Sequence, residues 1–176
     1  MIIKSTRLDG IFEIENKKLS DDRGVFIKTF HTDIFKEHNL QTDFKESFYS
    51  VSKKNVLRGM HFQLPPHDHA KLVYVVDGEI LDVVVDVRKE SSTFGQFYST
   101  NLSSDNAKSL YIAKGFAHGF LTLSESATVI YSISTVYAPD FDEGIRWDSF
   151  GFDWEVDAPV MSTRDVDFQG LKNLRL

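Results

Sequence analysis

The feature that most constrains the fold of this chain is a series of short apolar segments separated by turn residues. In the clearest segment, Leu or Val occupies every second position from Leu81 to Val87, and Asp stands at two of the positions between them. This period of two predicts a β-strand with one apolar face. The dipeptide Asp77-Gly78 separates it from another apolar run, and such a pair is typical of a two-residue β-hairpin turn.

Similar segments of strand composition recur along most of the chain. We expect strands at residues 11–15, 24–30, 44–51, 56–62, 71–76, 79–87, 95–102, 109–112, 119–123 and 128–137. Helix signals occur only at 32–39, where Thr32 would cap the first turn, and near 162–171. Many short antiparallel strands with little helix predict an all-β sandwich or barrel. No repeat or linker interrupts the pattern, so we expect one domain over residues 1–176.

Composition limits the class of protein further. A formal charge of −6 over 176 residues argues against a general nucleic-acid surface, which needs an excess of Lys and Arg. The absence of Cys excludes disulfides and thiolate metal ligands. The first residues have no apolar signal core, and no run reaches the roughly 18 apolar residues of a membrane span. We therefore expect a cytoplasmic protein with neither nucleic-acid nor membrane partners.

Ionisable residues gather in the segment from Val56 to Gly78. His61 is a candidate general base, because neutral imidazole accepts protons near pH 7. Arg58 and Lys71 lie close to it in the sequence, and their positive charges require anionic partners. Residues 58 and 61 would point to opposite faces of a regular strand. Both can serve one pocket only if Gly59 allows a bulge or a strand end.

A competing hypothesis uses His67, His69 and His118 as three imidazole ligands of Fe, Mn or Zn. The H-x-H pair followed by a later G-x-x-H resembles the layout of metal-binding cupin barrels. In that layout a carboxylate is expected at the position of Lys71, and an ammonium group beside a divalent metal is electrostatically unfavourable. His118 could instead be a buried structural residue that is bonded to backbone.

Tyr131 would lie on the apolar inner face of its strand, where a Tyr is usually a core residue with a satisfied hydroxyl. Asp165 and Arg23 have two interpretations each. Asp165 follows Ser162 at capping-box spacing, but it could also orient a His ring and stabilise the imidazolium. Arg23 is either a turn residue or a phosphate clamp.

Taken together, the motifs resemble those of the dTDP-4-dehydrorhamnose 3,5-epimerase family, which are metal-independent cupins acting on nucleotide-linked 4-keto sugars. The resemblance runs through nearly the whole chain in order. Its pieces are DDRGVF (21–26), VLRGMHFQ (56–63), KLVYVVDGEILDVVVDVR (71–88), SSTFGQF (91–97), AKGFAHGFLTLSE (113–125), YAPDFDEGIRWD (137–148) and STRD (162–165). It implies a cupin jelly roll with an N-terminal strand arm and a short C-terminal helix.

The resemblance also implies roles for individual residues. His61 would remove the proton next to the C4 ketone, with Asp165 as its partner, and Lys71 would stabilise the enolate oxygen. Tyr131 would return a proton from the opposite face, so no cofactor would be needed. Substrate contacts are implied for Arg23, Phe26, Arg58, His118, Glu143 and Ser162. The reaction would serve the synthesis of cell-surface polysaccharide, such as O-antigen or capsule, or of antibiotic sugars.

The family forms homodimers whose N-terminal strands, here within residues 1–50, pack across to the neighbouring subunit. Arg23 and Phe26 would then act in trans. The chain departs from the family pattern at several positions, so the nucleotide, the sugar and the inversion of C3, C5 or both stay open. A catalytically silent sugar-binding cupin is a further alternative. The departures are Lys28 for Glu, Glu46 for Gln, Phe48 for Asn, Ser132 for Lys, and His67 to His69 where a Gln usually precedes the Lys-containing strand.

Overall fold

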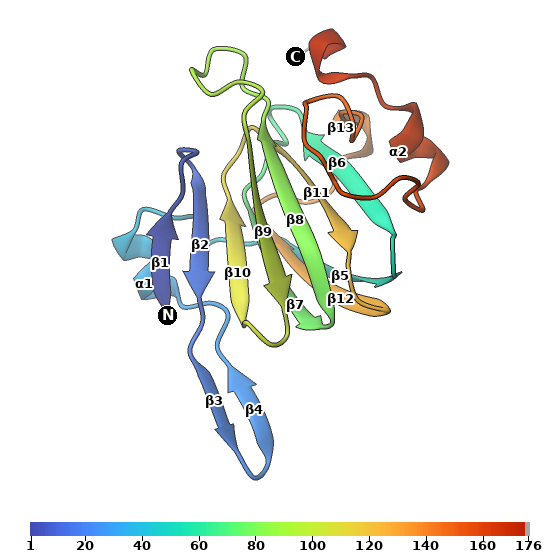
Figure 1. Cartoon of the computed structure of the whole chain (residues 1–176). Coiled ribbons are helices and arrows are strands. Elements are labelled where there is room, and N and C mark those ends of the chain that lie inside the picture. The colour runs from blue at the N-terminus through green and yellow to red at the C-terminus, as the bar shows by residue number, and fades with distance from the viewer. Residues whose placement is uncertain (175–176) are drawn as a thin grey trace.

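The computed structural model describes residues 1–174 and consists mainly of two antiparallel sheets that face each other (Figure 1). The first sheet contains, in spatial order, β1 (Ile2–Ser5), β2 (Ile11–Glu15), β10 (Lys108–Ile112), β7 (Lys71–Asp77), β12 (Ser126–Ile133) and β5 (Glu46–Lys53). The second contains β13 (Asp142–Gly144), β6 (Leu57–Gln63), β11 (Phe116–Thr122), β8 (Glu79–Asp86) and β9 (Phe97–Ser103). This arrangement confirms the predicted all-β jelly-roll sandwich.

The main core lies between the two sheets. Val73 and Val129 of the first sheet pack in one buried cluster with Ile80, Val84 and Phe120 of the second. Burying apolar side chains on both inner faces is what holds a sandwich together, at about 25 cal/mol per Å² removed from water. The pocket described below opens between these same sheets.

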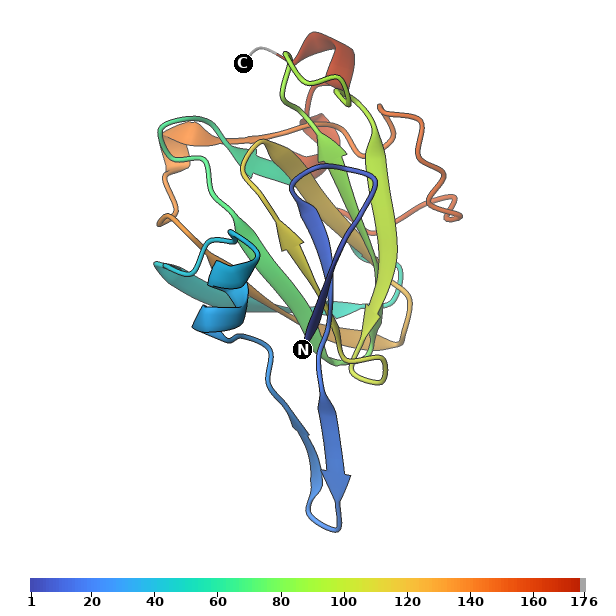
Figure 2. The same cartoon turned by 90° about the vertical axis from the view of Figure 1, so that its left-hand side faces the viewer.

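The outer face of each sheet is also covered. Val83, Val85 and Val87 pack under the C-terminal segment, where Phe150 and Trp154 complete a second buried cluster. Strand β8 is therefore buried on both faces, whereas its sequence predicted one apolar face. The segment around α1 (Thr32–Glu37) covers the outer face of the first sheet through Phe35 and Leu40 (Figure 2).

A two-stranded hairpin projects away from the sandwich (Figures 1 and 2). It is formed by β3 (Lys18–Asp21) and β4 (Gly24–Ile27). Three of its apolar side chains are largely exposed, with Phe26 at 61%, Val25 at 56% and Leu19 at 49%. A protruding hairpin with exposed apolar residues is typical of a segment that packs against another molecule.

The Asp77-Gly78 hairpin prediction is wrong. β7 pairs with β10 and β12, whereas β8 pairs with β11 and β9, so Gly78 forms a corner between the two sheets. Gly78 has φ +77°, and a Cβ atom there would clash with the backbone of Ser126 and Ala127. Asp-Gly indicates a position where the backbone adopts a positive φ. A corner between two sheets requires such a residue, just as a tight hairpin turn does.

The helices are shorter than predicted. The N-cap of α1 is His31, without a side-chain cap, so Thr32 is the first helical residue and not the cap. Near the C-terminus, α2 covers only Thr163–Asp167, and short 3-10 turns follow at Leu171–Asn173 and occur earlier at Pro139–Phe141. The part of the chain that the structure describes contains no helix long and apolar enough to cross a bilayer.

Candidate active site

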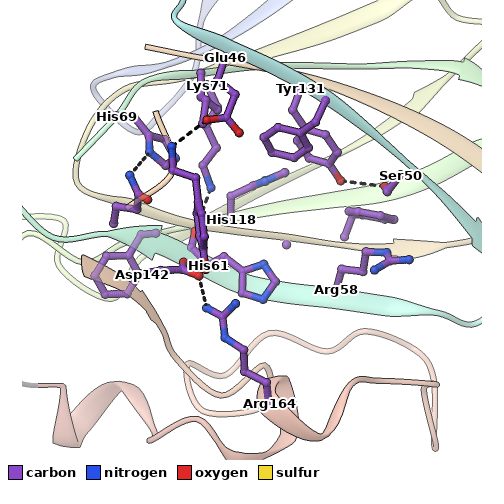
Figure 3. A pocket seen from close by; sticks show the side chains of 17 residues that line it. Glu46, Ser50, Arg58, His61, His69, Lys71, His118, Tyr131, Asp142 and Arg164 are labelled. Atoms are coloured by element: carbon purple, nitrogen blue, oxygen red, sulfur yellow. Dashed lines mark hydrogen bonds and ion pairs between the residues drawn. The ribbon is translucent and has the colours of Figure 1, made fainter. Parts of the chain in front are cut away.

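A cavity of about 470 Å³ opens between the two sheets and is lined by half of the predicted site residues: Arg58, His61, Lys71, His118 and Tyr131 (Figure 3). Its walls come from both sheets and from α2. It is lined by Glu46, Phe48, Ser50, Arg58, His61, Phe62, Gln63, His69, Lys71, His118, Gly119, Phe120, Tyr131, Ile133, Tyr137, Asp142 and Arg164.

Arg58 and His61 share this cavity because β6 is irregular between them. His118 of β11 pairs with His61 and Phe120 pairs with Arg58, so three steps on β6 match two steps on β11. The extra residue lies at Gly59 and Met60, and Gly59 has φ +134°. The bulge that the sequence required is therefore present, and it turns both side chains toward the same side.

His61 is paired with a buried carboxylate. Its Nε2 atom lies 2.8 Å from Oδ1 of Asp165, which is only 4% exposed. Burial would raise the pKa of Asp165, but hydrogen bonds from His61, the Gly59 amide and Ser162 hold it below its ordinary value. Asp165 is thus an anion that accepts from Nε2–H, which leaves the Nδ1 lone pair of His61 available as a base.

Asp165 fits both of its interpretations. Its backbone N–H donates to the Ser162 hydroxyl over 3.1 Å, so Ser162 caps α2. Its Oδ2 atom also accepts the N–H of Gly59 over 3.1 Å. The Ser162 cap sets where α2 begins. The position of that first turn places the Asp165 carboxylate against β6.

Lys71 is a buried cation at the beginning of β7. Its side-chain nitrogen donates to the backbone carbonyl of His61 over 3.0 Å, and the residue is 8% exposed. Burial lowers its pKa to about 8, and the charges of Asp142 and Asp82 oppose that shift. The ammonium group is therefore held next to His61 by a hydrogen bond, and it is poorly solvated.

Tyr131 lies on the opposite wall from His61, because β12 and β6 belong to different sheets (Figure 3). Its hydroxyl lies 3.3 Å from the Ser50 hydroxyl, and its ring stacks on Phe48 at 4.8 Å. Burial raises the pKa of Tyr131, so the phenol stays protonated at neutral pH. The cavity thus has the His61 imidazole on one wall and a protonated phenol on the other.

His118 forms a second His–carboxylate pair deeper in the sandwich. Its Nε2 atom lies 2.8 Å from Asp82, and both side chains are buried. The sequence predicted that a structural His118 would bond to backbone. That prediction is wrong, because its partner is the Asp82 side chain. Burial lowers the pKa of His118, and the negative charge of Asp82 opposes the shift.

The structure does not support the three-histidine metal hypothesis. His67 packs its ring against Phe141 and does not line the cavity, whereas His69 and His118 do. Within residues 1–174, no three His, Asp or Glu side chains are arranged to hold a metal ion. His118 is instead engaged by Asp82, and Lys71 adds a positive charge beside His69.

Four residues with implied substrate contacts lie away from the cavity. Arg23 and Phe26 are on the projecting hairpin, where Arg23 pairs with Asp21. Ser162 lies beneath Asp165 as the helix cap. Glu143 is exposed on the far face of β13, in a separate surface depression.

Several cavity residues were not found from the sequence. Asp142 lines the cavity in place of its neighbour Glu143, as expected when successive strand residues point to opposite faces. Strand alternation shows that only one of these two residues can face the cavity. Deciding which one requires the register of β13, which the sequence does not show. Arg164 pairs with Asp142 over 2.8 Å, a contact between distant segments that no local pattern reveals. Ser50 was likewise not assigned, His69 was named only as a metal ligand, and Glu46 only as a departure from the family pattern.

Comparisons with known proteins identify the family of this chain. The family model for dTDP-4-dehydrorhamnose 3,5-epimerase matches residues 5–173. An enzyme of that name from Methanothermobacter thermautotrophicus is 42% identical, over 95% of this chain and 92% of its own length. A dTDP-6-deoxy-D-glucose-3,5-epimerase from Legionella pneumophila, solved with dTDP-4-keto-L-rhamnose, superposes with a TM-score of 0.94 at 35% identity, covering 99% of this chain and 94% of the other.

A third comparison extends the likeness to antibiotic-sugar enzymes. NovW, a 4-keto-6-deoxy sugar epimerase from Streptomyces spheroides, superposes with a TM-score of 0.94 at 33% identity, covering 98% of this chain and 88% of that one. The matches include both sheets, the projecting hairpin and the C-terminal segment that carries Asp165. The chain therefore belongs to the dTDP-4-dehydrorhamnose 3,5-epimerase family.

Proposed function

We propose that this protein epimerises a nucleotide-diphospho-4-keto-6-deoxy sugar at C3, C5 or both. The observation that carries the proposal is the His61–Asp165 pair, facing Tyr131 across one cavity with the Lys71 ammonium beside it. A base, an acid on the opposite wall and a cation between them are what inversion next to a ketone requires.

The first step is proton removal by His61. Its Nδ1 lone pair takes the proton from the carbon beside C4, the C–H electron pair forms a C=C bond, and the carbonyl π pair moves onto the oxygen. The enolate so formed carries its negative charge on that oxygen. Lys71 stabilises the charge where it develops, and Asp165 stabilises the imidazolium.

The second step is protonation from the other face by Tyr131. The C=C electron pair takes the phenol proton while the oxygen lone pair re-forms the C=O bond, which leaves a phenolate. Solvent reprotonates this phenolate and takes up the proton that the His61 imidazolium holds. The raised pKa of Tyr131 supports this role, because the group is protonated when the enolate forms. The reaction is redox-neutral, so neither electrons nor a cofactor enter its balance.

The diphosphate would be held by Arg58 and by residues of a second subunit. Arg58 lines the cavity and is positioned by its bond to Ser52 over 2.9 Å. Arg23 and Phe26 do not line their own cavity, and the β3–β4 hairpin that carries them projects away from the sandwich (Figure 1). We therefore propose a homodimer in which the hairpin of one subunit reaches the site of the other. The exposed apolar side chains of that hairpin support the proposal.

Proton NMR in deuterated water tests the function. Purified protein would be incubated with dTDP-, CDP- and GDP-linked 4-keto-6-deoxy sugars, and loss of the C3 and C5 proton signals would be followed. We expect exchange and inversion with one of these carriers, and the carbons that exchange identify the inverted centres. Binding without exchange for every sugar would overturn the proposal in favour of a silent sugar-binding cupin.

A further inference from the structure

His69 is a cavity residue without a role in the reaction proposed above. It precedes β7 by two positions and lines the same wall as Lys71 (Figure 3). Within residues 1–174, Gln63 is the one side chain that hydrogen-bonds this ring, at 3.1 Å from Nδ1. The Nε2 atom has no protein partner among these residues. Its hydrogen-bonding capacity is therefore available to a bound molecule.

The orientation of the Gln63 amide is fixed by the backbone. Its Oε1 atom accepts the N–H of Ala138 over 2.7 Å, so the oxygen end faces Ala138. Its Nε2 atom donates to the carbonyl of His67 over 2.7 Å. A flipped amide would place oxygen against oxygen at His67 and N–H against N–H at Ala138. Gln63 must therefore present N–H to His69.

An amide N–H facing Nδ1 determines where the imidazole proton lies. An amide nitrogen cannot accept a hydrogen bond, so Nδ1 of His69 accepts and the ring proton is on Nε2. The competing tautomer would carry its proton on Nδ1 and set two N–H groups 3.1 Å apart. The Nε2–H tautomer avoids this conflict.

The surroundings keep this ring uncharged. Burial and the neighbouring Lys71 charge lower the pKa of His69 to about 3, with smaller contributions in the same direction from His118 and Lys114. The His67 carbonyl acts in the opposite direction and is outweighed. A neutral donor can therefore stand next to the ammonium group without the repulsion that a second cation would add.

We propose that His69 donates a hydrogen bond from Nε2–H to the C4 oxygen of the substrate, beside the Lys71 ammonium, and that Gln63 is the positioning residue that fixes this tautomer. This inference rests on the proposed epimerase function. A carbonyl oxygen has two lone pairs, and an enolate oxygen binds both donors more strongly than the ketone does. His69 would thus contribute mainly to the rate of enolate formation.

The tautomer is tested without any substrate. Nitrogen-15 NMR of histidine-labelled protein distinguishes a protonated ring nitrogen from an accepting one, and His69→Gln assigns the signal. We expect the proton on Nε2 and a ring that stays neutral from pH 8 down to about pH 4. A proton on Nδ1, or protonation near pH 6.5, would overturn the inference.

The role in the reaction is tested with a pair of side chains of similar length. His69→Met removes the donor, and His69→Gln keeps an N–H. We expect His69→Met to lower kcat for solvent exchange about ten- to a hundredfold with KM changed less than about threefold, and His69→Gln to recover most of the loss. His67→Met is the matched control, because His67 lies outside the cavity, and it should stay within about twofold of the unmodified protein.

The outcomes separate the two proposals. If the unmodified protein exchanges no proton of any 4-keto sugar, the epimerase function fails, and the tautomer is still judged by NMR. If it exchanges normally and His69→Met is equally fast, only the role of His69 fails. A fall in rate that His69→Gln does not recover would also contradict a hydrogen-bond donor.

Discussion

At the scale of single residues, Lys71 is the group whose environment has the clearest thermodynamic consequence. Its pKa is lowered from 10.5 in an open chain to about 8 by burial. Between those values the unfolded chain binds the proton that the folded protein has released. The unfolding free energy should therefore rise with pH through this window, because stability increases wherever the unfolded state binds more protons.

We predict that Lys71→Met removes this rise. From pH 8 to 9.5 the Lys71 contribution to the unfolding free energy should grow by about 2 kcal/mol, since one pKa unit corresponds to about 1.4 kcal/mol. Urea denaturation at several pH values measures it, and Lys89→Met at an exposed position is the control. If the unfolding free energy changes equally with pH in the unmodified protein, Lys71→Met and Lys89→Met, the Lys71 ammonium is not buried.

Asp165 gives the second residue-scale prediction. In Asp165→Asn an amide N–H can face Nε2 of His61, which would move the ring proton to Nδ1 and block the base. We expect the exchange rate to fall by about 10² to 10⁴, as for other carboxylate–His pairs. Asp167→Asn, an exposed change in the same helix, should leave the rate within about twofold. A rate for Asp165→Asn within threefold of the unmodified protein would show that the carboxylate does not orient the base.

At the scale of secondary-structure elements, the irregularity of β6 is what brings Arg58 and His61 together. Gly59→Ala should disrupt it, because the new Cβ would lie 2.5 Å from Gly119 Cα and 3.0 Å from the His118 carbonyl. Neither backbone atom can move without breaking the β6–β11 pairing. We expect a loss of more than about 3 kcal/mol of stability, seen as a lower melting temperature or insoluble protein.

Gly151→Ala is the matched control for this change. Gly151 also has a positive φ, of +80°, but a Cβ atom there would meet nothing within 4 Å. Its cost should be only the conformational strain of about 1 kcal/mol. If Gly59→Ala and Gly151→Ala melt at the same temperature, the stability loss comes from backbone strain and not from the close approach of β11.

The elements also show what the sequence could predict. Most strands were recognised because their period of two is local, and the need for a bulge at Gly59 followed from the spacing of Arg58 and His61. The assignment of β7 and β8 to different sheets was missed, because Asp77-Gly78 has the same local signal in a corner as in a hairpin. The choice between Asp142 and Glu143 depends on the register of β13, and the contact of Arg164 with Asp142 depends on the tertiary fold.

At the scale of the whole molecule, the proposed homodimer would complete each site with the projecting hairpin of the second chain. A complementation experiment tests this directly. Arg23→Ala and His61→Ala subunits would be co-expressed with different tags, and the mixed dimer would be purified. If Arg23 acts in trans, one of the two sites in the mixed dimer contains intact His61 and intact Arg23. Exchange activity should then return to about half that of the unmodified dimer, while each parent variant stays impaired.

Two results would contradict the shared site. A mixed dimer no more active than the average of its parents would mean that Arg23 serves its own chain or no site. Sedimentation experiments at assay concentrations would show whether the fully active protein is a monomer. If it is, no second subunit contributes to the site.

The central claim is that His61 removes the proton and Tyr131 returns it from the opposite wall. The most direct measurement compares deuterium exchange with inversion in the same NMR sample for His61→Ala and Tyr131→Phe. His61→Ala should abolish both, whereas Tyr131→Phe should still exchange deuterium into the 4-keto sugar without inverting the carbon, because His61 can return a solvent-derived deuteron to the face it deprotonates. Exchange that survives in His61→Ala, or inversion at the unmodified rate in Tyr131→Phe, would contradict the assignment of base and acid.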